Sequence, residues 1–512
     1  MQGDATVKIK DRNIDPAVIQ KIPAKFASHY KVMPLEFKDN KLTIAMADPS
    51  DIRALDDLKL ILNMEIKGVS SSEPEILEAI RKYYGVGAET LDKMISTEDA
   101  LHTAMPLTEK VQDINALAED ASIIKFVNQM LSEAIKDRAT DIHLEPFQNE
   151  LRVRFRIDGV LYNINTPVTI KFFHSAIVSR IKIMGALDIA ERRLPQDGRI
   201  MIKVNEEELD LRVSTLPMPF GEAVHLRILS SRFFLELEKL GLFPDDLAII
   251  EQMIKRPHGI IFATGPTGSG KSTTLYAALA RINSNAVKII TIEDPIEYQM
   301  HGVNQIQVIP KIGLNFATGL RHMLRHDPDV MMVGEVRDYE TAEIAIRAAL
   351  TGHLVFSTLH TNDAAGAVTR LLDMGVEPFL VSSSLECLIA QRLLRLICPA
   401  CKEPIKSKDE IFGQMKDIEF DAQKTEIFAG KGCPECRFTG FRGRTGIYEI
   451  LTVNEPIREL ILSRASSQQI KQKAVSQGMR TLRQDGVQKV LKGLTTFTEV
   501  MRVTQQEEPP ED

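Results

Sequence analysis

The sequence has no long hydrophobic run, and this argues against a transmembrane helix. None of its apolar stretches reaches the roughly 18 residues that such a helix needs. The nearest candidate, residues 379–398, contains Glu386, Arg392 and Arg395 and is predicted to be a helix inside a water-soluble core. The beginning of the chain has no apolar segment of the kind that directs secretion. We therefore expect a cytoplasmic protein that reaches any membrane only through a partner.

The sequence also lacks an excess of positive charge. It has 63 lysine and arginine residues against 70 aspartate and glutamate residues, which gives a formal net charge of −7. A protein that holds nucleic acid on a broad basic surface usually shows the opposite balance. We therefore expect no nucleic-acid partner, although a local basic channel is compatible with this composition.

Cysteine is scarce, with five residues in 512. Four of them form two C-x-x-C pairs, which are Cys398 with Cys401 and Cys433 with Cys436. In a reducing cytoplasm, paired cysteines indicate a metal site rather than disulfides. Four thiolate ligands with no open position predict a closed, structural zinc site over residues 398–436. Four free thiols or a redox-active dithiol are the alternatives. The fifth residue, Cys387, is predicted to lie on the apolar face of a core helix.

The first 240 residues show a mixture of strand and helix signals. Residues 35–37 and 41–46 predict two strands joined by a turn, and Ser50 is expected to cap the helix that follows. Residues 123–135 carry one apolar helical stripe. Residues 151–157 alternate apolar residues with arginine, as in a strand with one polar face, and Asp158-Gly159 is typical of a hairpin turn.

From about residue 242, short apolar strands alternate with amphipathic helices, a pattern typical of a mostly parallel sheet covered on both faces. The predicted strands are residues 260–263, 288–292, 330–333 and 354–357. The predicted divisions of the chain are a small N-terminal α/β domain (1–88), a linker (89–120), an α+β domain (121–240), an α/β core (241–397), the cysteine-bounded insertion (398–436), a C-terminal helical region (437–504) and a disordered tail (505–512).

The strongest motif is a phosphate-binding loop over residues 265–272, which fits G-x-x-x-x-G-K-[ST] between a predicted strand and a predicted helix. Its glycines let the backbone wrap around phosphate oxygens, and the helix presents its positive end to the anion. Lys271 is expected to reach the β- and γ-phosphates, and Ser272 to hold Mg²⁺. The predicted ATP-binding residues of this segment are Gly265, Pro266, Thr267, Gly268, Ser269, Gly270, Lys271, Ser272 and Thr273. The alternative is an ordinary glycine-rich turn.

Hydrolysis of ATP also needs a group that positions water. Acidic clusters follow two strands that are expected to flank the strand before the phosphate-binding loop, so their carboxylates would face the ligand. An acid commonly ends the second of these strands, but this sequence has Gly334 there. No carboxylate at that position can therefore hold the metal. We predict that Glu335 positions water and the Mg²⁺ shell, with Glu293 and Glu297 as helpers. Helix caps or solvated loop carboxylates are the alternatives.

Four segments together resemble the boxes of the secretion ATPase superfamily. They are the phosphate-binding loop, Ile-Glu-Asp-Pro-Ile-Glu-Tyr (292–298), Asp-Pro-Asp-Val-Met-Met-Val-Gly-Glu-Val-Arg-Asp (327–338) and Thr-Gly-His-Leu-Val-Phe-Ser-Thr-Leu-His-Thr-Asn (351–362). They are similar to the family's Walker A, Asp, Walker B and His boxes. The resemblance covers residues 18 to 500, is nearest to the GspE/PulE branch of type II secretion ATPases, and extends to the pilus assembly (PilB-like) ATPases.

This resemblance implies an α/β fold in which a RecA-like P-loop ATPase core follows an α+β (PAS-like) domain. It implies ATP, Mg²⁺ and Zn²⁺ as cofactors and a hexameric ring. By resemblance, Arg212 and Arg227 look like arginines that reach the γ-phosphate when their domain closes. Arg321, Arg325 and Arg337 are weaker candidates, since exposed charge is the default for arginine.

The two histidines of the fourth segment, His353 and His360, bracket its predicted strand. A histidine beside a core strand is more often a hydrogen-bonded structural residue. The resemblance instead assigns both of them to the nucleotide site.

The N-terminal domain resembles the adaptor by which these ATPases dock to an inner-membrane assembly protein (GspL-like), and the driven partner would be an inner-membrane platform protein (GspF-like). The sequence lacks the full leucine- and glycine-rich motif for cyclic-di-GMP, so we predict no binding of that nucleotide. The zinc knuckle and the long N-terminal region favour secretion or pilus assembly over pilus retraction. A pilus assembly motor, a RecA-like DNA translocase and a nucleotide-dependent scaffold are the alternative functions.

Overall fold

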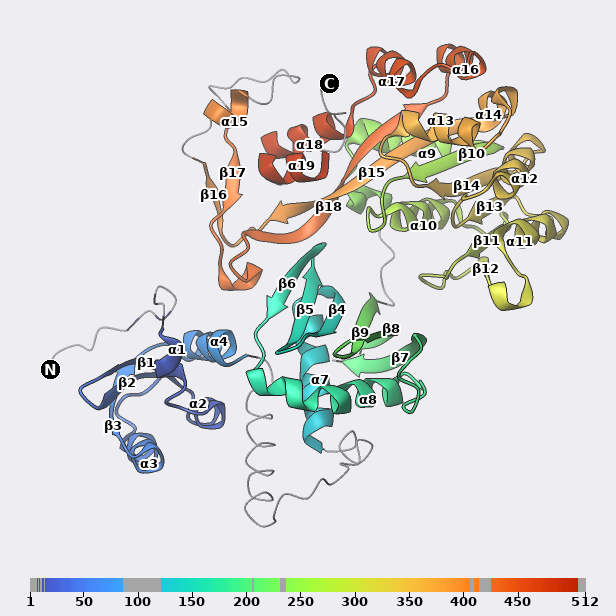
Figure 1. Ribbon diagram of the computed structural model, residues 1–512. Helices are drawn as coiled ribbons and strands as arrows, with labels where there is room; N and C mark the ends of the chain where they lie inside the picture. Colours follow the sequence, from blue (N-terminus) through green and yellow to red (C-terminus); the bar gives the residue numbers. More distant parts are fainter. Residues whose placement is uncertain are drawn as a thin grey trace. The chain divides into compact units, whose positions relative to one another are not determined.

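The computed structural model describes residues 14–85, 121–204, 207–230, 236–405, 409–413 and 425–504, together with Val7, Ile9 and Arg12. The chain divides into two compact units, residues 1–231 and residues 232–512, each considered by itself (Figure 1). The predicted linker (89–120) and the predicted tail (505–512) lie outside the described residues. None of the helices in the described ranges is long and apolar enough to cross a membrane.

The first unit begins with a three-stranded sheet of order β1-β2-β3 and four helices. The elements are α1 (Pro16–Ile19), α2 (Ala24–Tyr30), β1 (Val32–Lys38), β2 (Lys41–Met46), α3 (Ile52–Leu62), β3 (Glu65–Ser70) and α4 (Glu73–Tyr84). The predicted hairpin is confirmed, and positive φ angles at Asp39 and Asn40 give it the two-residue turn that matches strand twist. The predicted cap is wrong. Asp51 accepts the N–H of Ala54, whereas the Ser50 hydroxyl donates to Asp48 Oδ1 at 2.6 Å.

The same unit continues with a six-stranded antiparallel sheet of order β6-β5-β4-β9-β8-β7. Its elements are α7 (Ala121–Lys136), β4 (Ala139–Pro146), β5 (Leu151–Ile157), β6 (Val160–Ile164), the 3-10 helix η1 (Val168–Phe173), α8 (His174–Met184), β7 (Gln196–Val204), β8 (Glu207–Met218) and β9 (Gly221–Ser230). The apolar stripe of α7 is buried, as predicted. Along β5, Leu151, Val153 and Phe155 are buried while the arginines between them are partly exposed, which confirms a strand with one polar face.

The second unit is built on a seven-stranded sheet of order β12-β11-β13-β14-β10-β15-β18, parallel except for the last pair. Up to the end of the long strand β15, its elements are η2 (Leu237–Leu240), α9 (Pro244–Met253), β10 (Gly259–Thr264), α10 (Lys271–Ile282), β11 (Ile289–Glu293), β12 (Val303–Gln307), η3 (Pro310–Ile312), α11 (Phe316–Met323), η4 (Leu324–His326), β13 (Val330–Val333), α12 (Tyr339–Leu350), β14 (Leu354–Leu359), α13 (Ala364–Asp373), α14 (Pro378–Ser384) and β15 (Leu385–Ile397). The remaining elements are β16 (Lys402–Pro404), α15 (Asp409–Gly413), β17 (Phe428–Gly430), η5 (Pro434–Cys436), β18 (Phe441–Thr452), α16 (Glu455–Leu462), α17 (Ser467–Ser476), α18 (Leu482–Leu491) and α19 (Phe497–Thr504).

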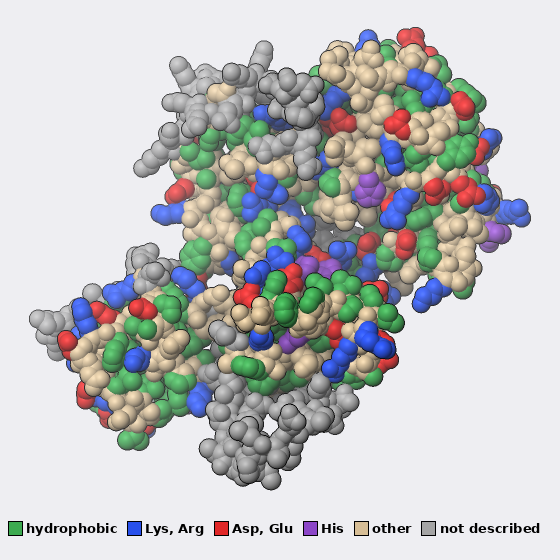
Figure 2. Space-filling model, viewed as in Figure 1, with side chains coloured by type: hydrophobic (Ala, Val, Ile, Leu, Met, Phe, Trp, Pro, Cys, Tyr) green, Lys and Arg blue, Asp and Glu red, His purple; other side chains and the backbone are tan. Residues whose placement is uncertain are grey.

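Helices cover both faces of this sheet, as predicted. Successive residues of a strand point to opposite faces, and β10 shows this directly. Ile260 and Phe262 pack into a core with α11 to α14 and the C-terminal helices, whereas Ile261 and Ala263 pack into a second core with α9 and α10. On the face drawn in Figure 2, acidic and basic side chains lie next to one another over this unit rather than separating by sign.

Two predictions for the C-terminal part are wrong for one reason. The sequence predicts one helix over residues 379–398, which includes Cys387, and it predicts a helical region over residues 437–504. The helix α14 ends at Ser384, and β15 contains Cys387 and pairs with β18. Both strands are largely buried, so their apolar runs show no alternation, and periodicity cannot distinguish such a run from a buried helix. The helical prediction holds only from Glu455 onward.

The predicted position of the acidic strands is also wrong. The strand β10 has β14 and β15 as its neighbours, while β13 is one strand further away and β11 is two strands further away. Crossover connections let β14, which follows β13 in the chain, insert between β13 and β10. The acidic strand ends nevertheless remain on the same edge of the sheet as the end of β10, because all these strands are parallel.

Candidate functional site

The phosphate-binding loop connects the end of β10 to the start of α10, as predicted. Gly270 has a φ of +90°, and a Cβ there would lie 2.7 Å from the side-chain nitrogen Nε2 of Gln391, which is buried on β15. A side chain at this position would therefore be both strained and obstructed. No heavy atom lies within 4 Å of a Cβ built on Gly268, so the middle of the loop faces open space. This cradle and the positive N-terminal end of α10 fit the phosphates of a nucleotide.

Lys271 is 8% exposed, and its amine is held by the loop itself. The Nζ atom donates to the carbonyl oxygens of Gly265 at 2.8 Å and Pro266 at 3.1 Å. Burial, assisted by the charge of Arg392 and opposed by that of Glu335, lowers the pKa of the Lys271 amine to about 8. Phosphate oxygens would replace the two carbonyl groups as partners of this amine. Ser272, the predicted Mg²⁺ ligand, is the next residue of α10.

Glu335 lies just beyond the end of β13, beside two basic side chains. Its Oε1 atom is 2.6 Å from the Arg337 guanidinium, and its Oε2 atom is 3.3 Å from Nε2 of His360, which follows β14. The backbone around it is fixed by the Thr358 hydroxyl, which donates to the Gly334 carbonyl at 2.7 Å. The structure therefore brings His360 and Glu335 together at the sheet edge where Lys271 also lies.

Glu293 ends β11 and is buried among hydrogen-bond donors. Its carboxylate accepts bonds from the Tyr276 hydroxyl, from Thr291 Oγ1 at 2.6 Å and from Gln305 Nε2 at 3.1 Å. Burial and the Glu293 charge raise the pKa of the Tyr276 hydroxyl far above its usual range. Glu293 thus attaches α10, which carries Lys271, to β11. The Glu297 backbone N–H donates to the same Tyr276 oxygen at 3.3 Å.

His353 does not share this position with His360. It precedes β14, and its carbonyl accepts the N–H of Gly259, the first residue of β10, at 3.1 Å. The whole length of both strands therefore separates His353 from the phosphate-binding loop of the same chain. Its assignment to a nucleotide site stays a prediction. Its Nδ1 atom lies 3.0 Å from the Ala348 carbonyl, which is a structural contact.

The predicted arginines are distributed over both units. Arg212 and Arg227 face each other across β8 and β9 of the first unit. Arg227 Nε donates to Asp141 Oδ1 at 3.0 Å. Burial alone would raise the pKa of Asp141, but bonds from His225, Thr140 and Arg227 outweigh it and hold that pKa well below its usual range. The three weaker candidates lie in the second unit: Arg321 pairs with Glu340, Arg325 lies in η4, and Arg337 pairs with Glu335.

Sequence reasoning missed Arg392 as a neighbour of the loop. Arg392 is 7% exposed on β15 and donates to the carbonyl oxygens of Gln391 at 3.0 Å and Asn362 at 2.8 Å. A Cβ built on Gly265 would lie 2.9 Å from Arg392 Nη1. The available signal was an arginine within an otherwise apolar run, since a buried charge requires partners.

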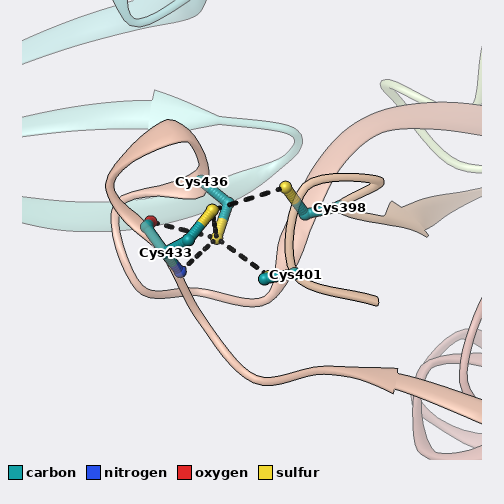
Figure 3. A group of neighbouring side chains, drawn as sticks. All are labelled: Cys398, Cys401, Cys433 and Cys436. Carbon is teal, nitrogen blue, oxygen red and sulfur yellow. Dashed lines mark hydrogen bonds between the residues drawn. The ribbon is translucent and has the colours of Figure 1, made fainter. Parts of the chain in front are cut away.

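The four cysteines predicted to bind zinc lie together (Figure 3). Their sulfur atoms are all within 4.8 Å of one another, and three of the pairs, Cys398–Cys433, Cys401–Cys436 and Cys433–Cys436, are 3.8 Å apart. Zn–S bonds of about 2.3 Å in a tetrahedron place the sulfurs about 3.8 Å apart, so the geometry fits zinc.

Backbone N–H groups favour the ionised, thiolate form of one cysteine in this cluster. The N–H groups of Cys433 and Gly440 donate to the Cys436 sulfur at 3.2 and 3.3 Å. Burial opposes ionisation, but these bonds outweigh it and lower the pKa of Cys436 to about 7. The donor set and its surroundings are compatible with a closed structural zinc site.

Gly430→Ala is expected to weaken this zinc site. A Cβ on Gly430 would overlap the carbonyl oxygen of Gly440, which precedes β18 and supports Cys436. We expect the free energy of unfolding of the knuckle to fall by about 2–4 kcal/mol and zinc to be lost at a lower chelator concentration. Competition with a chelator measures this. Gly413→Ala is the matched control, since nothing lies within 4 Å of a Cβ there. Equal zinc retention by both variants would contradict the expectation.

Comparison with known proteins agrees with this site. Residues 116–502 match the family described as Type II/IV secretion system protein, and residues 5–90 match the MshEN domain. The chain is 46% identical over 505 residues to the type IV pilus assembly ATPase PilB of Myxococcus xanthus, covering 98% of this chain and 88% of that protein. It is 44% identical over 499 residues to the type II secretion system ATPase E of Vibrio cholerae, covering 95% and 97%.

A solved structure supports the fold of the core. The ATPase DotB of Legionella pneumophila matches with a TM-score of 0.55 at 22% identity, covering 75% of this chain and 96% of that chain. At this identity the likeness shows the fold, and it agrees with the predicted P-loop core. The family match covers residues 116–502, and the two relatives are similar to this chain over nearly their whole length. The chain therefore belongs to the Type II/IV secretion system protein family and is one of its ATPases.

Proposed function

We propose that this ATPase powers protein export through a type II secretion system. It would act as a homo-hexamer and drive pseudopilus assembly through an inner-membrane platform protein. The observation that carries the proposal is the meeting of the phosphate-binding loop, Glu335 and His360 at one sheet edge in a chain 44% identical to the Vibrio cholerae type II secretion ATPase.

The chain's own residues divide the chemistry of ATP hydrolysis. Lys271 would bind the β- and γ-phosphates once they replace its carbonyl partners. Glu335 would orient the attacking water, with His360 holding its Oε2 atom in place. Mg²⁺ bound with ATP would neutralise phosphate charge, and Ser272 is the residue that would hold it. Arg212 and Arg227 would supply positive charge to the γ-phosphate from the α+β domain.

Glu293 and Glu297 would assist indirectly. The Glu293 carboxylate and the Glu297 backbone N–H both contact Tyr276 of α10, the helix that begins with Lys271. They would therefore fix the direction in which α10 presents its N-terminal end.

The domain assignment follows the same proposal. Residues 1–88 would be the docking domain for an inner-membrane assembly protein, residues 121–240 the arginine-bearing domain and residues 241–397 the ATPase core. The match of residues 5–90 to the MshEN domain supports a separate N-terminal module. The chain would thus lie at the inner membrane through partners, with zinc in residues 398–436 as a structural element.

A type IV pilus assembly motor is the second candidate, because the chain is 46% identical to the Myxococcus xanthus pilus assembly ATPase over 505 residues. The chemistry would be the same, and the driven machine would differ. A DNA translocase has no comparable support.

The deciding experiment replaces Glu335 with glutamine in the source cell and compares exported proteins and surface pili with those of the parent. Loss of exported enzymes with intact pili is expected. Loss of pili with normal export would instead identify a pilus assembly ATPase. If neither the exported proteins nor the pili change, both functions are contradicted. The DNA translocase and the nucleotide-dependent scaffold would then be the remaining candidates. A Glu343→Gln strain is the control, because Glu343 pairs with Arg347 on α12 and has no role in the proposed chemistry.

A further inference from the structure

Four consecutive residues after β14 are each bound by a different part of the second unit. His360 contacts Glu335, which follows β13, at 3.3 Å. The Thr361 N–H donates to the hydroxyl of Thr264, the last residue of β10, at 3.0 Å. The Asn362 carbonyl accepts a bond from the Arg392 guanidinium on β15 at 2.8 Å, and Asp363 pairs with Lys471 on α17 at 3.2 Å. We call residues 360–363 the coupling segment.

Lys471 reaches this segment from the C-terminal helices and is partly buried. Its Nζ atom lies between Asp363 Oδ2 at 3.2 Å and Glu449 Oε2 at 3.6 Å. Glu449 has no exposed surface, and its other oxygen accepts the N–H of Ala364, the first residue of α13, at 2.9 Å. Removal of one partner from a buried ion pair is strongly destabilising, because the charge that stays behind is left uncompensated.

Arg392 also holds the segment, from β15. Its guanidinium forms a bridge from the Asn362 carbonyl to the Gln391 carbonyl of β15, beside Gly265 of the phosphate-binding loop. The planar fork of arginine can bind two acceptors at fixed angles, which lysine cannot do. The segment is therefore fixed at Asn362 and Asp363, two and three residues after the histidine that contacts Glu335.

We propose that Lys471 and Arg392 are positioning residues for ATP hydrolysis, which hold the coupling segment so that His360 keeps Glu335 in place. This inference rests on the proposed role of Glu335. It makes α17 part of the support of the nucleotide site, although α17 follows the phosphate-binding loop by almost 200 residues and no known box of the sequence includes it.

The test uses the full-length protein with Lys471→Met, which keeps the length of the side chain and removes its charge. We expect kcat for ATP to fall about tenfold while KM and the affinity for a fluorescent ATP analogue stay within about twofold, since only the arrangement for hydrolysis changes. Lys471→Arg is expected to restore most of the rate. Lys473→Met is the matched control, because Lys473 is exposed on the same helix.

A double-mutant cycle separates positioning from general destabilisation. In a His360→Ala background, Lys471→Met should lower kcat by less than about twofold, because the contact through which it acts is already gone. Equal factors in both backgrounds, or a parental kcat for a folded Lys471→Met protein, would overturn the inference. If Lys471→Met does not fold, Arg392→Lys carries the same test: it keeps the charge and loses the fork, and it should show the same fall in kcat and the same non-additivity.

The proposed function is tested separately in the same assay by Glu335→Gln. An inactive Glu335→Gln protein beside an unaffected Lys471→Met protein would remove only this inference. A fully active Glu335→Gln protein would remove the proposed role of Glu335 itself.

Discussion

Replacing Glu335 with glutamine is expected to lower the turnover number for ATP at least about 100-fold, since positioned acid–base groups commonly contribute factors of 10²–10⁴. Glutamine has nearly the same shape and can keep a contact with His360, but it cannot accept a proton from water. The affinity for ATP should stay within about twofold, because the loop and Lys271 are unchanged. Phosphate release and binding of a fluorescent ATP analogue measure the two effects.

The Glu343→Gln protein is the control for this experiment, and it should hydrolyse ATP at the parental rate. A Glu335→Gln protein that turns over like the parent would show that another group positions the water. A loss of affinity together with turnover would instead assign Glu335 to binding of the nucleotide.

Cys433→Ser is expected to reduce zinc from about one ion per chain to less than about one tenth, because a structural site of four thiolates loses its closed shell when one is removed. Zinc-dependent knuckles gain much of their folding energy from the metal, so residues 398–436 should also become sensitive to protease. Elemental analysis of the purified protein and limited proteolysis measure these effects.

Cys387→Ala provides the matched comparison, since Cys387 is buried in β15 and lies outside the cluster of four sulfurs. It should keep its zinc. A parental protein with far less than one zinc per chain would contradict the site itself, whereas full zinc in Cys433→Ser would show that three cysteines suffice.

Local patterns were enough to predict where the phosphate-binding loop and the cluster of four cysteines lie. The phosphate-binding loop depends on a strand, a glycine-rich turn and a helix that are adjacent in the sequence. The zinc site depends on two C-x-x-C pairs, each of which places its ligands within one turn of the chain. Glu335 follows from the rule that parallel strands end at a common edge.

Long-range pairing could not be predicted in the same way. The strands β15 and β18 pair over many residues but are buried, so their sequences carry no period that separates strand from helix. The insertion of β14 between β13 and β10 is a choice among crossovers that the sequence does not encode locally. It also decides that the end of β14, which His360 follows, lies beside the end of β13, which Glu335 follows.

The side chains that support the site were missed for a related reason. Arg392 and Lys471 meet the coupling segment only because β15 and α17 return to it from distant parts of the chain. Neither residue belongs to a motif. Lys471 has the appearance of an ordinary surface charge until its partners are known, and for Arg392 only the apolar residues around it indicate burial.

The insertion between β15 and β18 begins and ends at neighbouring points of the sheet, and this affects how changes in its length are tolerated. Ile397 at the end of β15 pairs with Phe441 at the start of β18, and Pro404 of β16 pairs with Phe428 of β17. The intervening chain therefore departs and returns at neighbouring points, and loop closure costs rise only slowly with length. A change in the number of residues between Gly413 and Thr425 would therefore leave both strand pairs, and with them the register of β15 beside the phosphate-binding loop, in place. For the same reason, this is where a reporter protein could be inserted with little disturbance of the motor.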